Sequence, residues 1–177
     1  IETWSGGENL YRGGKGPLKV NRSKIDKKFP LFKSLIQAAA EAGYETFEDS
    51  NWFKQDGFGT FDVTIDKGKR QGVAKAYLEE VKNFNNLFVE HNTDVLKIVF
   101  NDKKAIGVQI KKNNKTEIYK CNKEIILSAG SINSPKILQL SGVGDPKLLK
   151  KNGIEVINEL RGVGKNLQDH LEIYIQH

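Results

Sequence analysis

The sequence predicts a mixed α/β fold: part of a doubly wound, nucleotide-binding sheet, together with an antiparallel β-meander and a region of loops around one helix. Three observations predict it. An amphipathic helix follows Pro30, short strands separated by polar turns fill residues 95–121, and an apolar strand at 123–130 runs into small residues and a helix start. Strand-to-helix units of the last kind form sheets that bind nucleotides at the carboxyl ends of their strands.

The first 70 residues are expected to hold loops, short strands and one helix. Glycines crowd residues 6–16, a composition typical of loops, and a short strand is expected at 18–20. After Pro30, apolar residues recur at helical spacing on one face. Gly43 should end this helix, because glycine readily takes the left-handed conformation found at helix C-termini.

The middle of the chain changes from helix to strands. A second helix is expected at about 72–82, and a strand at 86–91. Three further strands follow, at 95–100, 105–111 and 116–121. Because the turns between these three are short and rich in Asn, Asp and Lys, the strands should form an antiparallel meander.

A strand-to-helix unit comes next. The segment 123–130 has an apolar centre that ends in small residues, as expected of a buried parallel strand. Asn133 or Ser134 is expected to cap the following helix, and Pro135 suits its first turn, where the missing N–H would be unpaired anyway. The helix is predicted to be short, covering 136–140, and to stop before the next glycine.

Composition excludes several classes of function. The net charge is +6, but the lysines are scattered and do not alternate with aromatic residues, so we expect solvated surface and no nucleic-acid binding. Cys121 is the single cysteine and the three histidines are dispersed, so no metal site is expected. No apolar run approaches the roughly 20 residues that cross a membrane. The absence of methionine and an alternating stretch at 171–177 that resembles an unfinished strand lead us to expect a fragment.

The most specific segment is 130–144, Gly-Ser-Ile-Asn-Ser-Pro-Lys-Ile-Leu-Gln-Leu-Ser-Gly-Val-Gly. Its small residues, Ser-Pro helix start, aliphatic pair and Ser-Gly-Val-Gly ending closely resemble the second signature of the glucose–methanol–choline (GMC) flavoproteins. Four other segments are similar to that family: 11–18, 56–59, 68–78 and 162–170. Two positions depart from its pattern, since 11–18 lacks the usual histidine and Gln71 stands where Ser or Thr is common.

The resemblance covers essentially the whole chain and implies its organisation. Residues 1–70 would form part of the substrate-binding region, and 71–165 the central part of the domain that binds flavin adenine dinucleotide (FAD). Residues 166–177 would begin the return to the substrate-binding domain.

Two groups are implied to contact FAD. Val95 occupies the place of a family valine whose backbone hydrogen-bonds the adenine, and the turn Ser128-Ala129-Gly130 would lie near the adenosine. Small residues after the strand let the backbone approach a ligand closely, and a helix start presents free N–H groups to it. The alternatives are simple strand packing for Val95 and an ordinary helix start for the turn.

The resemblance also implies a substrate contact. Choline-oxidising relatives carry a glutamate at the position of Glu172, close to the trimethylammonium group. That group donates no hydrogen bond, so charge and aromatic faces must hold it; otherwise Glu172 is a solvated carboxylate. Asp169 and His170 point to opposite faces of an extended chain and are not expected to form a dyad. No catalytic residue is assigned, because the family's proton-handling His and its His/Asn partner match no position here.

The implied protein is an FAD-dependent oxidoreductase acting on CH–OH donors, which oxidises choline to betaine aldehyde for glycine betaine synthesis. Hydride would pass to the flavin and electrons onward to a respiratory acceptor. We expect a cytoplasmic location, with association at the inner face of the cell membrane left open. Three alternatives remain. One is a family member acting on another primary alcohol, and one is an isolated fragment that is catalytically inert. The third is a basic module that binds nucleic acid, against which the absence of a clustered basic face argues.

Overall fold

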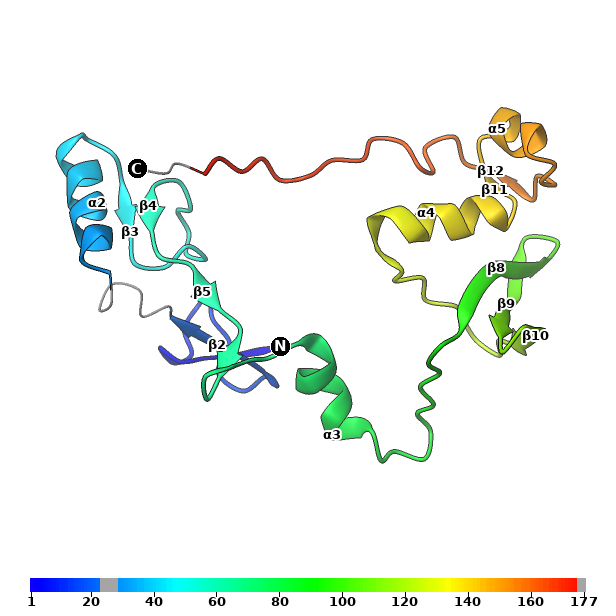
Figure 1. Ribbon diagram of the computed structural model, residues 1–177, viewed down its shortest axis with the longest axis horizontal. Helices are drawn as coiled ribbons and strands as arrows, with labels where there is room; N and C mark the ends of the chain where they lie inside the picture. Colours follow the sequence, from blue (N-terminus) through cyan, green and yellow to red (C-terminus); the bar gives the residue numbers. More distant parts are fainter. Residues whose placement is uncertain (23–28, 175–177) are drawn as a thin grey trace. The chain divides into compact units, whose positions relative to one another are not determined.

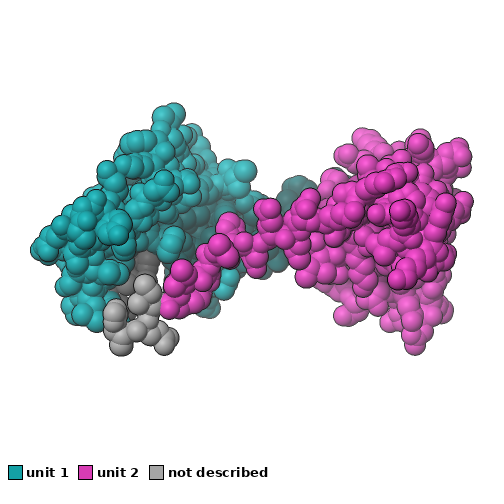
Figure 2. Space-filling view, turned by 90° about the horizontal axis from the view of Figure 1, so that it is seen from above, with its two compact units in different colours: residues 1–88 teal, residues 89–177 magenta. Residues whose placement is uncertain are grey.

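The computed structural model describes residues 1–22 and 29–174. The chain divides between Phe88 and Val89 into two compact units (Figure 2). Within the described ranges, no helix is both long and apolar enough to span a bilayer. The domain boundaries implied by the family resemblance, at 70/71 and 165/166, stay predictions.

Small sheets and helices build the described part of the first unit. A three-stranded sheet has the order β1-β2-β5, with β1 parallel to β2 and β2 antiparallel to β5. Two strand pairs accompany it: β3 with β4 in parallel, and β6 with β7 as a hairpin. The strand bounds are β1 Glu2–Trp4, β2 Leu18–Arg22, β3 Thr46–Phe47, β4 Phe58–Gly59, β5 Asp62–Val63, β6 Ile65–Asp66 and β7 Lys69–Arg70. The strand expected at 18–20 is therefore confirmed.

The predicted amphipathic helix is α2, Pro30–Glu41, and it contacts β3 and β4 (Figure 1). It ends as the sequence predicts, because Gly43 has a φ of 85°. The Tyr44 N–H donates to the Ala39 carbonyl at 2.9 Å and the Gly43 N–H donates to the Ala40 carbonyl at 3.0 Å. These are the two bonds of a Schellman motif, which satisfies carbonyls that the end of a helix leaves free.

The second predicted helix is also present, but the strand expected after it is not. Residues Ala74–Leu78 form the π-helical turn η1 and Glu79–Val81 the helix α3, with Ala76 buried. Residues 87–91 belong to no strand, and the Phe88 side chain is 84% exposed. The prediction of a strand at 86–91 is wrong for this chain, because a strand exists only where a neighbour pairs with its backbone.

The meander is the centre of the second unit. Strands β8 (Asp94–Asn101), β9 (Lys104–Lys112) and β10 (Lys115–Lys120) form an antiparallel sheet with the order β10-β9-β8. Asn113 and Asn114 both have positive φ, as a two-residue hairpin turn of type I′ requires. This part of the fold prediction is confirmed.

Helix α4 is longer than predicted. It covers Gly130–Leu140 and packs on β8 (Figure 1). Asn133 and Ser134 therefore lie inside the helix, and the prediction that one of them caps it is wrong. Pro135 also lies inside the helix. The helix tolerates it because the carbonyl that loses its partner, that of Ser131, is in the first turn and exposed.

The apolar segment before α4 is not a strand in this chain. Residues 124–128 have no strand assignment, and the Ile126 side chain is 78% exposed. Its apolar pattern is that of a buried strand, but no strand among the described residues pairs with it. The prediction of a parallel strand at 123–130 is thus wrong here, for the same reason as at 86–91.

A short strand–helix–strand unit that the sequence did not predict follows α4. Strand β11 (Val143–Gly144) runs parallel to β12 (Asn158–Glu159), and α5 (Pro146–Lys151) connects them. The Asp145 side chain caps α5 by accepting from the Lys147 N–H at 2.9 Å. Asp followed by Pro is the usual signature of such a start and could have revealed it.

The described residues at the end of the second unit form no strand either. Residues 171–174 have no strand assignment and are exposed, and residues 175–177 of the predicted stretch lie outside the described residues.

Gly142 joins α4 to β11 and tolerates no side chain. Its φ is 84°, and a Cβ would lie 2.5 Å from the Glu155 carbonyl oxygen. Gly153 has a φ of 68° but open space around it. We expect Gly153→Ala to cost about 1 kcal/mol of stability from the left-handed conformation alone. Gly142→Ala should cost at least about 1 kcal/mol more, because the backbone must also shift.

Denaturant unfolding of the full-length variants measures this difference. Equal losses for the two substitutions would contradict the close approach at Gly142.

Candidate functional site

Strand β8 offers an unpaired edge near Val95. The strand is outermost in its sheet, so its backbone groups on the side away from β9 have no strand partner among the described residues. Val95 pairs with Ile110 in register and is 44% exposed, and a β-bulge follows it before Lys97. An exposed strand edge next to a bulge can hydrogen-bond a planar heterocycle through the backbone. The strand setting thus fits the role that the resemblance implies for Val95.

The turn Ser128-Ala129-Gly130 leads directly into α4. All three residues are exposed, and no side chain caps the helix. The Ala129 N–H donates to Ser134 Oγ at 3.0 Å. Gly130 has a φ of 86°, and the space where a Cβ would lie is open. The N–H groups of the first turn thus have no side-chain cap and belong to exposed residues, so they can meet polar or negatively charged ligand atoms.

Ser141 holds α4 against β8. Its hydroxyl accepts from the Ile98 N–H at 2.8 Å and donates to the Ile137 carbonyl at 2.5 Å. Ser141 is buried, as are the side chains of Ile98 and Ile137. The two implied FAD-contacting groups thus belong to packed elements, Val95 to β8 and the turn to the start of α4.

Removing this hydroxyl should loosen the contact between α4 and β8. Ser141→Ala leaves the buried Ile98 N–H without its acceptor, which we expect to cost about 1–3 kcal/mol of stability. Ser34 is exposed on α2 and serves as a control, since Ser34→Ala should change stability little. Chemical denaturation of both variants tests the prediction, and a Ser141→Ala variant as stable as the control would contradict it.

A groove of about 640 Å³ runs beside α4. Its lining comes from α4 and from residues 164–168, and it includes the side chains of Lys136 and Lys165. Gln139 fixes one wall by donating through Nε2 to the Val163 carbonyl at 3.2 Å. Two cationic side chains and a helix start suit an anionic ligand. Residues 162–170 are recognisable in the sequence as a family segment, but no sequence pattern predicts a role for Lys136 or Gln139.

Glu172 lies in the exposed segment after the groove, not on β8 or α4. The Tyr174 hydroxyl donates to Glu172 Oε2 at 2.5 Å. This hydrogen bond, with some desolvation, raises the pKa of Tyr174, because the carboxylate favours the protonated phenol. Asp169 Oδ1 accepts from the backbone N–H of His170, not from its imidazole, so these two residues form no dyad of side chains.

The first unit contains a buried ionic cluster that no sequence pattern predicted. Arg12 donates to Asp49 through Nε at 2.9 Å and through Nη2 at 2.5 Å, and it also donates to Asp62. Arg22 Nε donates to Asp62 at 2.8 Å. The guanidinium groups of both arginines lie over the Trp4 ring, 5.0 and 5.3 Å from its centroid. The cluster therefore ties the glycine-rich loop to β2, β5 and the loop after β3.

The charges in this cluster stabilise each other. The hydrogen bonds from the Arg12 guanidinium hold the pKa of Asp49 below its usual value, against the desolvation that would raise it. The same bonds raise the pKa of Arg12. Arg12 is part of the segment 11–18 noted in the sequence, but nothing in that segment points to partners 37 and 50 residues away.

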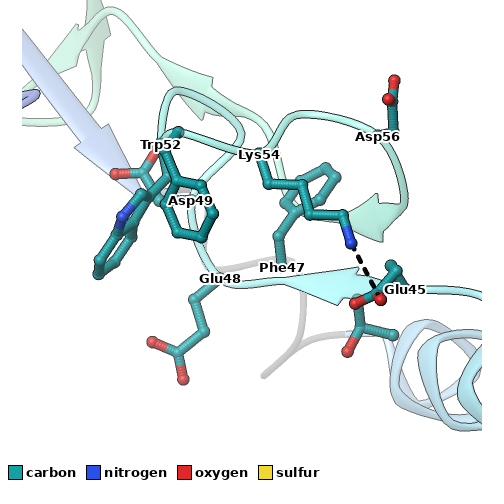
Figure 3. A pocket seen from close by; sticks show the side chains of 9 residues that line it. Glu45, Phe47, Glu48, Asp49, Trp52, Lys54 and Asp56 are labelled. Carbon is teal, nitrogen blue, oxygen red and sulfur yellow. Dashed lines mark ion pairs between the residues drawn. The ribbon is translucent and has the colours of Figure 1, made fainter.

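A pocket of about 400 Å³ opens beside the cluster (Figure 3). Its lining combines aromatic side chains, among them Phe47 and Trp52, with several carboxylates. Figure 3 shows Lys54 reaching across to Glu45, and the two form an ion pair at 2.9 Å. Over residues 1–22 and 29–174, no group of His, Cys, Asp and Glu has the arrangement of a metal site.

Comparison with protein families finds one match over nearly the whole chain. The GMC oxidoreductase family matches residues 2–172. The mitochondrial choline dehydrogenases of Mus musculus and Homo sapiens are 47% and 48% identical over 170 residues, which is 96% of this chain and 28% of each relative. The oxygen-dependent choline dehydrogenase of Photobacterium profundum is 42% identical over 99% of the chain and 31% of its own length. The chain thus spans about three tenths of these relatives.

Two solved flavin-enzyme and oxidase structures also match almost the whole chain. An FAD-dependent oxidoreductase from Chaetomium thermophilum matches with a TM-score of 0.87 and 33% identity, over 95% of this chain and 31% of its own. Pyridoxine 4-oxidase from Mesorbium loti matches with a TM-score of 0.88 and 26% identity, over 96% of this chain and 33% of its own.

Proposed function

Since this chain belongs to the GMC oxidoreductase family, whose cofactor is FAD, we propose that the full-length protein is a choline dehydrogenase. One observation carries the proposal: relatives named choline dehydrogenase, from mammals and from a bacterium, share 42–48% of their residues with at least 96% of this chain. Glu172 supplies a carboxylate of the kind that a quaternary ammonium substrate needs.

The described residues fit the adenosine part of FAD. The edge of β8 at Val95 offers backbone hydrogen bonds, and the turn Ser128-Ala129-Gly130 leaves room for close approach. When bound, FAD supplies the hydride acceptor for the carbinol carbon. Within this chain, Val95 and the turn would hold the adenosine, and Glu172 would orient the cationic end of the substrate. No residue of this chain is assigned to remove the hydroxyl proton.

In the proposed reaction choline loses a hydride and a proton and becomes betaine aldehyde. The hydrate of the aldehyde can lose a second hydride and proton in the same way and become glycine betaine. A respiratory acceptor then takes the electrons at the inner face of the cell membrane, in this proposal. The isolated 177-residue chain is expected to show no turnover.

A second candidate is oxidation of another primary alcohol. The likeness to pyridoxine 4-oxidase, at a TM-score of 0.88, supports this second candidate, because one fold can serve more than one substrate. Such an enzyme would have no need of an anion at Glu172.

The visible spectrum of the full-length protein, recorded before and after anaerobic addition of choline, tests the proposal. A flavin spectrum that choline bleaches supports a choline dehydrogenase. A flavin spectrum that choline leaves unchanged, but another primary alcohol bleaches, selects the second candidate. The same spectra recorded for the isolated 177-residue chain test whether it is inactive, as expected.

A further inference from the structure

Glu172 and Tyr174 form a pair on one side of the chain. They are two residues apart in an extended segment, where alternate side chains share a face. The Tyr174 hydroxyl donates to Glu172 Oε2 at 2.5 Å, and both side chains are exposed. The carboxylate thus has one oxygen held by a phenol and the other, Oε1, available to a cation.

The pair combines the two features by which proteins bind a quaternary ammonium group. Such a cation offers no N–H, so it is attracted by negative charge and by the electron-rich face of an aromatic ring. Glu172 provides the charge. The Tyr174 ring lies close to the same carboxylate, because the Tyr174 hydroxyl is hydrogen-bonded to it, so one cation can contact both groups. A carboxylate held in one orientation also loses less conformational freedom when the cation arrives.

We infer that Tyr174 is a specificity-determining residue that orients the Glu172 carboxylate toward a quaternary ammonium group. This inference rests on the proposed function, since it concerns the same substrate site. It adds a residue, Tyr174, that acts through Glu172 in recognising the cationic end of the substrate.

The test compares choline with its uncharged carbon isostere, 3,3-dimethylbutan-1-ol, in the full-length enzyme. Tyr174→Phe keeps the ring and removes the hydroxyl. It should raise the KM for choline about 3- to 10-fold, which corresponds to the net contribution of one ordinary hydrogen bond. The KM for the isostere should not change, because the isostere carries no charge. The kcat for both alcohols should not change either, because the cation is held equally in the ground state and in the transition state. Tyr119→Phe, an exposed tyrosine on β10, is the matched control.

A double-mutant cycle separates orientation of the carboxylate from a general structural role. In a Glu172→Gln background, Tyr174→Phe should change the KM for choline less than twofold, because the charge that it orients is gone. Additive effects, or equal changes in KM for choline and the isostere, would overturn the inference.

Binding of tetramethylammonium distinguishes this inference from the proposed function. It has no hydroxyl and cannot be oxidised, so its Kd, measured by equilibrium dialysis, does not depend on choline turnover. If Tyr174→Phe raises the Kd for tetramethylammonium at least threefold, the pair is supported as a cation site. This holds even if choline fails to bleach the flavin, a result that would reject only the proposed function. A Kd that is the same in wild type and variant overturns the inference while leaving choline oxidation standing.

Discussion

Replacing Arg12 by alanine is expected to lower the free energy of unfolding by about 3–5 kcal/mol, because the change leaves buried carboxylates without their main counter-charge. Arg12 is 5% exposed and Asp49 4% exposed, so water cannot replace the lost hydrogen bonds. Arg12 also packs on the Trp4 ring, and that contact is lost as well. Denaturant unfolding of the full-length protein measures the change.

An exposed ion pair provides the control for Arg12. Arg161 Nε contacts Glu159 Oε1 at 2.5 Å, but both side chains are largely exposed. Arg161→Ala should therefore change stability little, because water solvates the remaining charge. Similar losses for Arg12→Ala and Arg161→Ala would show that the buried cluster adds nothing beyond a surface pair.

The cluster also has a pH signature. The pKa of Asp49 is lower in the folded protein than its ordinary value of 3.8, chiefly because Arg12 donates hydrogen bonds to it. A carboxyl whose folded pKa is depressed contributes stability above its unfolded pKa and loses it as the pH falls through the folded pKa. We therefore expect this contribution to be complete at neutral pH and to be lost progressively as the pH falls below about 4. In Arg12→Ala the same loss on acidification should be smaller.

The second large effect is expected at Glu172, where Glu172→Gln should weaken choline binding tenfold or more in the full-length enzyme. Glutamine has the same shape and can still accept the Tyr174 hydrogen bond, so the substitution removes only the negative charge. The attraction to the trimethylammonium group is lost, whereas binding of 3,3-dimethylbutan-1-ol, which has no charge, should be nearly unchanged. The KM for each alcohol, measured with an artificial electron acceptor, gives the comparison.

A surface glutamate shows whether any such change is specific. Glu117 is exposed on β10, and Glu117→Gln removes one charge without touching the segment of Glu172. It should leave both KM values unaltered. If Glu172→Gln also leaves the choline KM unaltered, the carboxylate is merely solvated and does not bind the cationic end of the substrate.

Local patterns determined much of this fold. The helix α2 and its end at Gly43, the three strands of the meander and the asparagine turn between β9 and β10 follow from residues close together in the sequence. The family was also recognisable from the sequence, because the segment 130–144 carries many constrained positions in a short run.

Partners far apart decided the rest. The segments 86–91 and 123–130 have the composition of strands but form none, because strand backbones need neighbours and no described strand pairs with them. The start of α4 at Gly130 was misplaced because Pro135 is tolerated one turn inside the helix. Local sequence signals a permitted helix start but not the one that is used.

The candidate sites divide in the same way. Motifs pointed to Val95, to the turn at 128–130 and to Glu172, and their roles stay predictions. Only the tertiary structure revealed Arg12 with Asp49 and Asp62, which lie 37 and 50 residues from it, and the link between Ser141 and Ile98, 43 residues apart. A sequence specifies which side chains can donate, accept or carry charge, whereas folding of the backbone decides which of them meet and lose their water.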